Sequence, residues 1–113
     1  MTTKRKSRND VDDRVFKALA GSDRRHILDL LRDGPLTTGD ICKKLPHLNR
    51  CTVMQHLGVL ETAELVITKK RGRSRWNYLD VAPIQGIYAR WIGDYASPSA
   101  NLLSRLKRDL ESV

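Results

Sequence analysis

Apolar side chains recur every three or four residues through most of the chain, and this spacing predicts amphipathic helices. Breaks in the pattern coincide with helix-ending residues such as Gly21, the pair Gly34-Pro35, and Pro46. Ser22 is predicted to be the N-cap of the second helix. The expected fold is therefore mainly α, with helices over residues 11–20, 22–33, 37–45, 50–62, 83–95 and 99–110.

One stretch departs from the helical pattern. Residues 65–68 (Leu-Val-Ile-Thr) are β-prone, and residues 76–79 (Trp-Asn-Tyr-Leu) have large rings at alternate positions. Between them, residues 69–75 contain five basic side chains and Gly72, which is suited to a turn because glycine adopts positive φ freely. The pattern predicts a small β-hairpin whose tip is cationic.

The third and fourth predicted helices are separated by a brief connection, and Asn49 is the natural N-cap of the second of them. A short helix, a tight turn and a second helix is the helix-turn-helix pattern. In residues 50–62 the apolar stripe is Val53, Leu57 and Leu60. The nearly opposite face carries Cys51, Gln55 and Gly58. The helix over residues 50–62 therefore has one apolar face for the core and one polar face for a partner.

Length and composition limit the class of protein. A chain of 113 residues with 40% hydrophobic and 30% charged side chains is typical of a single globular domain. We expect a flexible basic tail over residues 1–9 and one domain over residues 10–113. The N-terminal residues lack the apolar stretch of a signal peptide, so the expected location is cytoplasmic, where both cysteines would stay reduced.

Positive charge is concentrated in two segments. The net charge is +8, and residues 1–9 hold four basic side chains and no acidic one. Residues 41–79 hold eight basic and two acidic side chains. Clustered like charges repel one another unless a polyanion neutralises them, which points to nucleic acid or an anionic membrane surface. A charge that serves solubility alone is the other interpretation.

The polar face of residues 50–62 suits the major groove of DNA, which is about 12 Å wide and admits one α-helix. Arginine pairs bidentately with guanine and glutamine with adenine, whereas cations on a hairpin grip phosphates and fix the register. The alternative for the hairpin is a solvated edge whose charge protects it against aggregation. The predicted DNA contacts are Asn49, Arg50, Thr52, Met54, Gln55, His56, Lys69, Lys70, Arg71, Gly72, Arg73 and Arg75.

Four segments together resemble ArsR-type winged-helix transcriptional regulators, which are ArsR/SmtB-like proteins: residues 16–20, 22–31, 50–60 and 61–66. The resemblance covers roughly residues 11–80. It implies a winged helix-turn-helix that binds an operator as a homodimer, usually as a repressor. It also implies dimerisation through terminal helices, here residues 11–20 and 83–95. The predicted interface residues are Val11, Val15, Leu19, Ile84, Ile87, Tyr88 and Trp91.

The chain departs from the metal-sensing members of that family. Thr37 and Gly39 stand where those relatives carry a Cys-x-Cys pair, and residues 83–95 contain no His or Cys. Borderline and soft metals need several N or S ligands, so no metal and no cofactor is expected. Cys42 is expected to be an apolar filler, whereas Cys51 is expected to face outward, where its thiol would be accessible to oxidation.

These observations predict a sequence-specific, double-stranded DNA-binding transcriptional regulator, a homodimeric repressor with an inverted-repeat operator. No nucleophile, base and orienting group occur at a recognisable spacing, so an enzyme is not expected. Two alternatives stay open. One is a winged helix that binds another protein and has lost operator binding, and the other is a thiol-responsive regulator that uses Cys51. The operator sequence, the regulated genes and any effector are not encoded in a recognisable motif.

Overall fold

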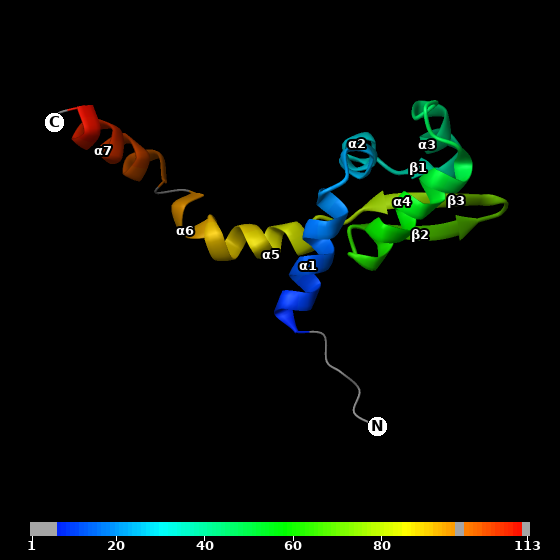
Figure 1. Ribbon diagram of the computed structural model, residues 1–113, viewed down its shortest axis with the longest axis horizontal. Coiled ribbons are helices and arrows are strands. Elements are labelled where there is room, and N and C mark those ends of the chain that lie inside the picture. The colour runs from blue at the N-terminus through cyan, green and yellow to red at the C-terminus, as the bar shows by residue number, and fades with distance from the viewer. Residues whose placement is uncertain (1–6, 97–98, 112–113) are drawn as a thin grey trace, which may run out of the picture. The chain divides into compact units, whose positions relative to one another are not determined.

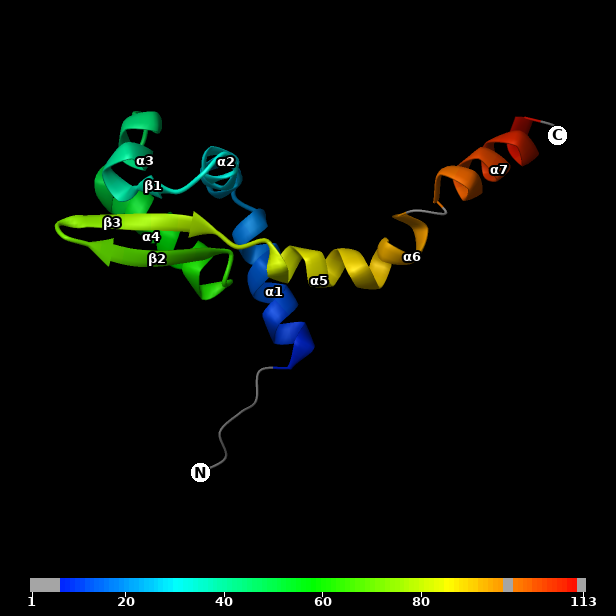
Figure 2. The same cartoon turned by 180° about the vertical axis from the view of Figure 1, so that it is seen from behind.

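The computed structural model describes residues 7–96 and 99–111 of the chain, and these fall into two compact units, Met1–Pro83 and Ile84–Val113. The first unit carries the helix-turn-helix and the hairpin, and Figures 1 and 2 show it from opposite sides. The elements in chain order are α1 (Arg8–Leu19), α2 (Ser22–Leu31), β1 (Leu36–Thr37), α3 (Thr38–Lys44), α4 (Arg50–Thr62), β2 (Val66–Arg71), β3 (Ser74–Leu79), α5 (Ala82–Trp91), α6 (Gly93–Ala96) and α7 (Ser99–Glu111).

Helix α1 begins earlier than its apolar stripe suggests. The Ser7 hydroxyl accepts a hydrogen bond from the Asp10 amide at 3.2 Å, which is N-cap geometry. Arg8 and Asn9 therefore belong to the helix, and the prediction that the basic tail extends to residue 9 is wrong for these two residues. The rest of that predicted tail, residues 1–6, lies outside the described residues.

The junction between α1 and α2 corrects a predicted cap. Gly21, not Ser22, occupies the N-cap position of α2, and no side chain caps the helix there. A Cβ on residue 21 would lie 2.6 Å from Cζ of Arg24, because the Arg24 side chain folds back across the glycine. Glycine thus provides the space that this close approach needs.

The helix-turn-helix forms as predicted. Thr37 caps α3 by accepting from the Asp40 amide at 3.1 Å, and Asn49 caps α4 by accepting from the Thr52 amide at 2.8 Å. Helix α4 ends at Thr62 with Ala63 as its C-cap, and the next residue, Glu64, is left-handed with φ of 61°. Such a position usually holds glycine, so glutamate is unusual there, although the helix ends at the predicted residue, Thr62.

The hairpin is longer than predicted and belongs to a three-stranded antiparallel sheet of order β1-β3-β2. Lys69 pairs with Trp76, and Lys70 pairs with Arg75. Three of the five cations assigned to the turn therefore lie on β2 and one on β3, and only Arg73 joins Gly72 (φ 60°) at the tip. The two-residue strand β1 carries no periodic signal, because two residues are too few to show one.

The core of the first unit lies between the helices and one face of the hairpin, and α4 crosses that face (Figures 1 and 2). Val53, Leu57 and Leu60 of α4 are buried, as predicted. Asn77 is the polar exception on β3 and is fully buried. Its amide nitrogen donates to the Leu36 carbonyl at 3.2 Å and to the Thr38 hydroxyl at 3.1 Å. This one side chain thus joins β3 to β1 and to the first residue of α3.

The second unit carries more exposed apolar surface. Ile84 and Ile87 on α5 are half-buried, and Tyr88 and Trp91 are 42% and 59% exposed. The helix predicted over residues 83–95 is interrupted after Trp91 and resumes as α6. Within the residues that the structure describes, no helix combines the length and apolar character needed to cross a membrane.

Candidate nucleic-acid interface

A cationic groove of about 390 Å³ lies beside the N-terminal half of α4. Four of its lining side chains are basic and none is acidic. They come from α4 and from both strands of the hairpin, so the fold assembles them from segments about twenty residues apart. The groove is lined by Thr37, Thr38, Gly39, Arg50, Met54, Lys70, Arg73, Ser74 and Arg75.

The register of the hairpin creates a charge conflict in this groove. Lys70 and Arg75 are directly opposite each other on β2 and β3. Like charges directly opposite each other destabilise a sheet. Arg50, in the first turn of α4, adds a third cation beside the positive end of a helix dipole. An anion placed in the groove would relieve this repulsion.

The structure brings together only part of the predicted DNA-contact set. Arg50, Met54, Lys70, Arg73 and Arg75 share the groove. The rest divide among other faces. Because side chains alternate along a strand, Lys69 and Arg71 point to the face of the hairpin opposite Lys70.

Two further predicted DNA contacts, Asn49 and Thr52, take part in the N-cap of α4. The Asn49 side-chain oxygen is used by the cap of α4, and Thr52 contributes the capped amide while its side chain is half-buried. Gln55 is exposed, and Gly58 is half-buried on the same outward face of α4. Gln55 is thus the predicted base-reading residue whose side chain faces outward.

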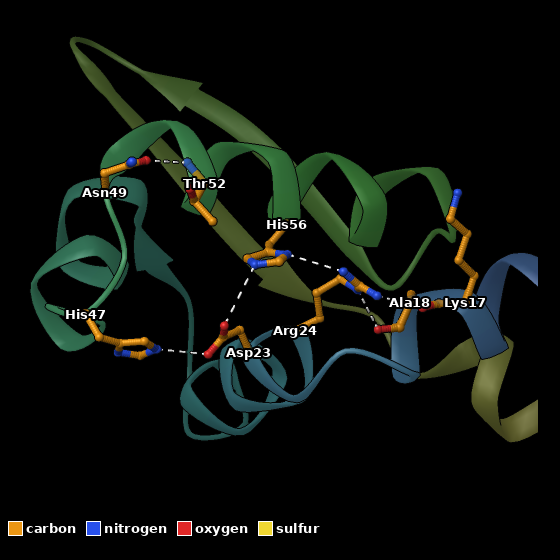
Figure 3. Close-up of polar contacts among 8 residues, drawn as sticks. All are labelled: Lys17, Ala18, Asp23, Arg24, His47, Asn49, Thr52 and His56. Carbon is orange, nitrogen blue, oxygen red and sulfur yellow. Dashed lines mark hydrogen bonds and ion pairs between the residues drawn. The ribbon is translucent and has the colours of Figure 1, made fainter.

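His56 faces α2 and not the outer surface of α4 (Figure 3). Its Nδ1 lies 3.3 Å from Nη1 of Arg24, and its Nε2 lies 4.0 Å from a carboxylate oxygen of Asp23. With its ring engaged on α2, His56 serves helix packing. We therefore leave it out of the proposed DNA contacts.

Arg24 is the centre of a network that sequence reasoning missed. Its Nε donates to the Ala18 carbonyl at 2.8 Å and its Nη2 to the Lys17 carbonyl at 2.9 Å, while Nη1 contacts His56 (Figure 3). One guanidinium thus joins the last turn of α1 to α4. In the sequence, Arg24 is visible only as an arginine close after Gly21, and that pattern does not specify a partner.

Asp23 links the same network to the turn of the helix-turn-helix. Nε2 of His47 lies 2.9 Å from one carboxylate oxygen of Asp23. This hydrogen bond, assisted by the charges of His47, His56 and His26, holds the pKa of Asp23 below its ordinary value of 3.8. The connection between α3 and α4 is thereby tied to the first turn of α2.

The lowered pKa of Asp23 predicts an acid-dependent loss of stability. A depressed folded-state pKa contributes stability above the ordinary value and loses it as the pH falls through the folded-state value. We expect Asp23→Asn to lower the free energy of unfolding at about pH 5.5, and this difference from the unaltered protein to shrink as the pH falls below 3.8. Urea titrations across this range measure both proteins. A difference that stayed constant with pH would contradict the assignment.

The cysteines fit a metal site poorly. Cys42 is half-buried, less than the full burial expected of an apolar filler, and Cys51 is exposed as predicted. Within the described residues, no three His, Cys, Asp or Glu side chains are grouped so that they could hold a metal ion.

Comparisons with known proteins identify the family to which this architecture belongs. Residues 21–68 match the family model "Bacterial regulatory protein, arsR family". The chain is 44% identical over 68 residues to the HTH-type transcriptional regulator Rv2034 of Mycobacterium tuberculosis, a match that covers 60% of this chain and 63% of that relative. It is 34% identical over 71 residues to the transcriptional repressor SdpR of Bacillus subtilis, covering 63% of this chain and 78% of that protein.

Solved structures agree with the sequence matches. The crystal structure of RHA00566, an ArsR family transcriptional regulator, superposes with a TM-score of 0.68 at 28% identity, covering 74% of this chain and 90% of that one. The resemblance predicted from residues 16–66 is therefore confirmed, as is the winged helix-turn-helix. The chain belongs to the ArsR family of bacterial regulatory proteins and is a DNA-binding transcriptional regulator, not an enzyme.

Proposed function

We propose that this regulator binds an inverted-repeat operator as a homodimer and acts as a repressor. The observation that carries the proposal is the groove beside α4, in which four basic side chains meet and no acidic one takes part. A phosphate backbone supplies the anion that relieves the repulsion between them. Repression is supported by one relative, SdpR, which is named as a transcriptional repressor.

The roles divide between the helix and the hairpin. Helix α4 enters the major groove with Gln55 outward, where its amide can pair bidentately with adenine. Arg50, Lys70, Arg73 and Arg75 contact phosphates beside the groove, which positions the helix without selecting a base. Affinity therefore depends mostly on the cations, and base choice depends on α4.

A dimer supplies the second half of the site. Two recognition helices must lie about 34–36 Å apart to read successive major-groove faces on one side of a duplex. The exposed rings of Tyr88 and Trp91 on α5 support pairing through this helix. Val11 and Leu19 remain candidates on α1, whereas Val15 is fully buried within its own unit and is left out of the proposed interface.

The proposal is tested by recovering bound duplexes from a random pool at moderate salt. We expect an inverted repeat whose half-sites are about one helical turn apart. Sedimentation of the complex should show two protein chains per duplex. Recovery of no preferred duplex would favour a winged helix that binds another protein, and a single unsymmetrical site would contradict the dimer.

The base-reading role of Gln55 predicts a local loss of specificity. Gln55→Ala should relax the preference at one base pair of each half-site by about 1–3 kcal/mol and leave the other positions unchanged. The control is Gln85→Ala, which truncates the exposed glutamine of α5. Competition binding against all four base pairs at each position measures the effect. An unchanged preference at every position would rule out this role.

A further inference from the structure

We propose that Arg14 and Lys17 of α1 form a second phosphate grip, which holds the DNA strand on the side of α4 away from the hairpin. This inference rests on the proposed binding of α4 in the major groove. Neither residue lies in a segment that the charge pattern singled out, because three acidic residues at positions 10, 12 and 13 directly precede them in the sequence. Only the packing of α1 against α4 brings them to the interface.

A second groove carries the argument. It lies between α1 and α4 and has a volume of about 570 Å³. Two cations from α1 line one side, and the outward residues of α4 line the other, without a carboxylate among them. The lining residues are Arg14, Lys17, Gln55, Gly58, Val59 and Thr62.

The two grooves lie on opposite flanks of α4. Successive residues of an α-helix are rotated by about 100°, so Arg50 in the hairpin-side groove and Val59 in the α1-side groove are about half a turn apart. Gln55 and Gly58 lie between these flanks on the exposed face. A helix seated in the major groove has one DNA strand on each flank. The hairpin cations thus face one strand, and the α1 cations face the other.

Both α1 cations are available to a phosphate. Lys17 is exposed and Arg14 is half-buried. Among the described residues, neither side chain has a carboxylate oxygen within 4.0 Å. Gly58 keeps the groove open because it projects no side chain, and the Thr62 hydroxyl is turned back onto the Gly58 carbonyl at 2.9 Å. The polar groups that remain to meet a ligand in this groove are the two cations and the Gln55 amide.

The Arg24 network holds this arrangement in place. Arg24 binds the carbonyls of Lys17 and Ala18 and also contacts His56 of α4. Figure 3 shows the Lys17 side chain extending from α1 toward α4, above the point where Arg24 meets the backbone. The distance between the two elements is therefore set before DNA binds, so little ordering is required of the α1 backbone on binding.

The test compares Arg14→Gln/Lys17→Gln with Arg32→Gln/Arg105→Gln, a control that removes two exposed cations elsewhere. Each neutralised phosphate contact contributes about 0.9 to the slope of log affinity against log salt. We expect the α1 double variant to lower that slope by about 1.8 and to bind its selected duplex roughly thirtyfold more weakly at 0.15 M salt. The control double variant should bind like the unaltered protein.

A second readout locates the contact. Methylphosphonate linkages, which are uncharged, are placed one at a time on the strand away from the hairpin. At one or two positions they should weaken the unaltered protein and have no further effect on the α1 double variant. Equal sensitivity of both proteins at every linkage would overturn the proposal.

The remaining outcomes separate this inference from the proposed function. If Arg73→Gln weakens binding and the α1 double variant does not, the second grip is wrong and operator binding stands. If neither change affects binding, the proposed function fails as well. If the α1 double variant sediments as a monomer at concentrations where the unaltered protein is a dimer, the groove is a subunit contact and the proposal is overturned.

Discussion

Replacing Lys70, Arg73 and Arg75 together with glutamine is expected to weaken operator binding on the order of a hundredfold at 0.15 M salt. These three side chains come from the hairpin and line the groove beside α4. Each phosphate contact that is lost removes the release of condensed counterions and lowers the salt slope by about 0.9. The slope of the triple variant should therefore be shallower by roughly 2.7.

The loss should be uniform across DNA sequences, because phosphate contacts carry no direct sequence information. A matched control is Arg32→Gln/Arg105→Gln/Lys107→Gln, which removes three exposed cations, one at the C-cap of α2 and two on α7, with the same change in net charge. Fluorescence anisotropy at several salt concentrations measures both variants. If the control and the hairpin variant lost affinity equally, the net charge of the protein, and not this groove, would govern binding.

The variant should also be at least as stable as the unaltered protein. Lys70 and Arg75 are cross-strand partners, and neutralising them removes their repulsion. A loss of binding accompanied by a stable fold separates a role in DNA contact from a structural role of the hairpin. Thermal unfolding of the free protein checks this point.

Leu60→Ala is expected to lower the free energy of unfolding by about 2–5 kcal/mol. Leu60 is fully buried on the inner face of α4, and its truncation leaves a cavity that the surrounding side chains fill only in part. Small domains are stable by about 5–15 kcal/mol, so this one change removes a large fraction of that stability. Denaturant titration of the free protein measures it.

Val81→Ala is the control for Leu60, since Val81 is 52% exposed and its truncation should cost less than about 0.5 kcal/mol. The Leu60 variant should bind DNA normally at a temperature where it is still folded, because Leu60 faces away from the outward surface of α4. An equal loss of stability in both variants would show that the inner face of α4 is not the anchor of the core.

The elements of the helix-turn-helix were predictable because their signals are local. Asn49 caps α4 through an amide only three residues away, and the inward stripe of Val53, Leu57 and Leu60 repeats at the helical period. The sequence therefore determined which face of α4 is outward and where the helix begins. It also determined that a basic hairpin follows, although the strands extend farther into the basic segment than their β-prone residues indicated.

Tertiary structure alone decided which side chains share a surface. A strand places neighbouring residues on opposite faces. The paired residues Lys70 and Arg75 therefore lie on the face of the hairpin that meets α4, and Lys69 lies on the other face. His56 contacts α2 because that helix packs against α4. The packing of α1 buries Val15 and places Arg14 and Lys17 in the groove beside α4. Local pattern specifies the period and the ends of an element, whereas the neighbour that each flank meets depends on contacts between residues far apart in the chain.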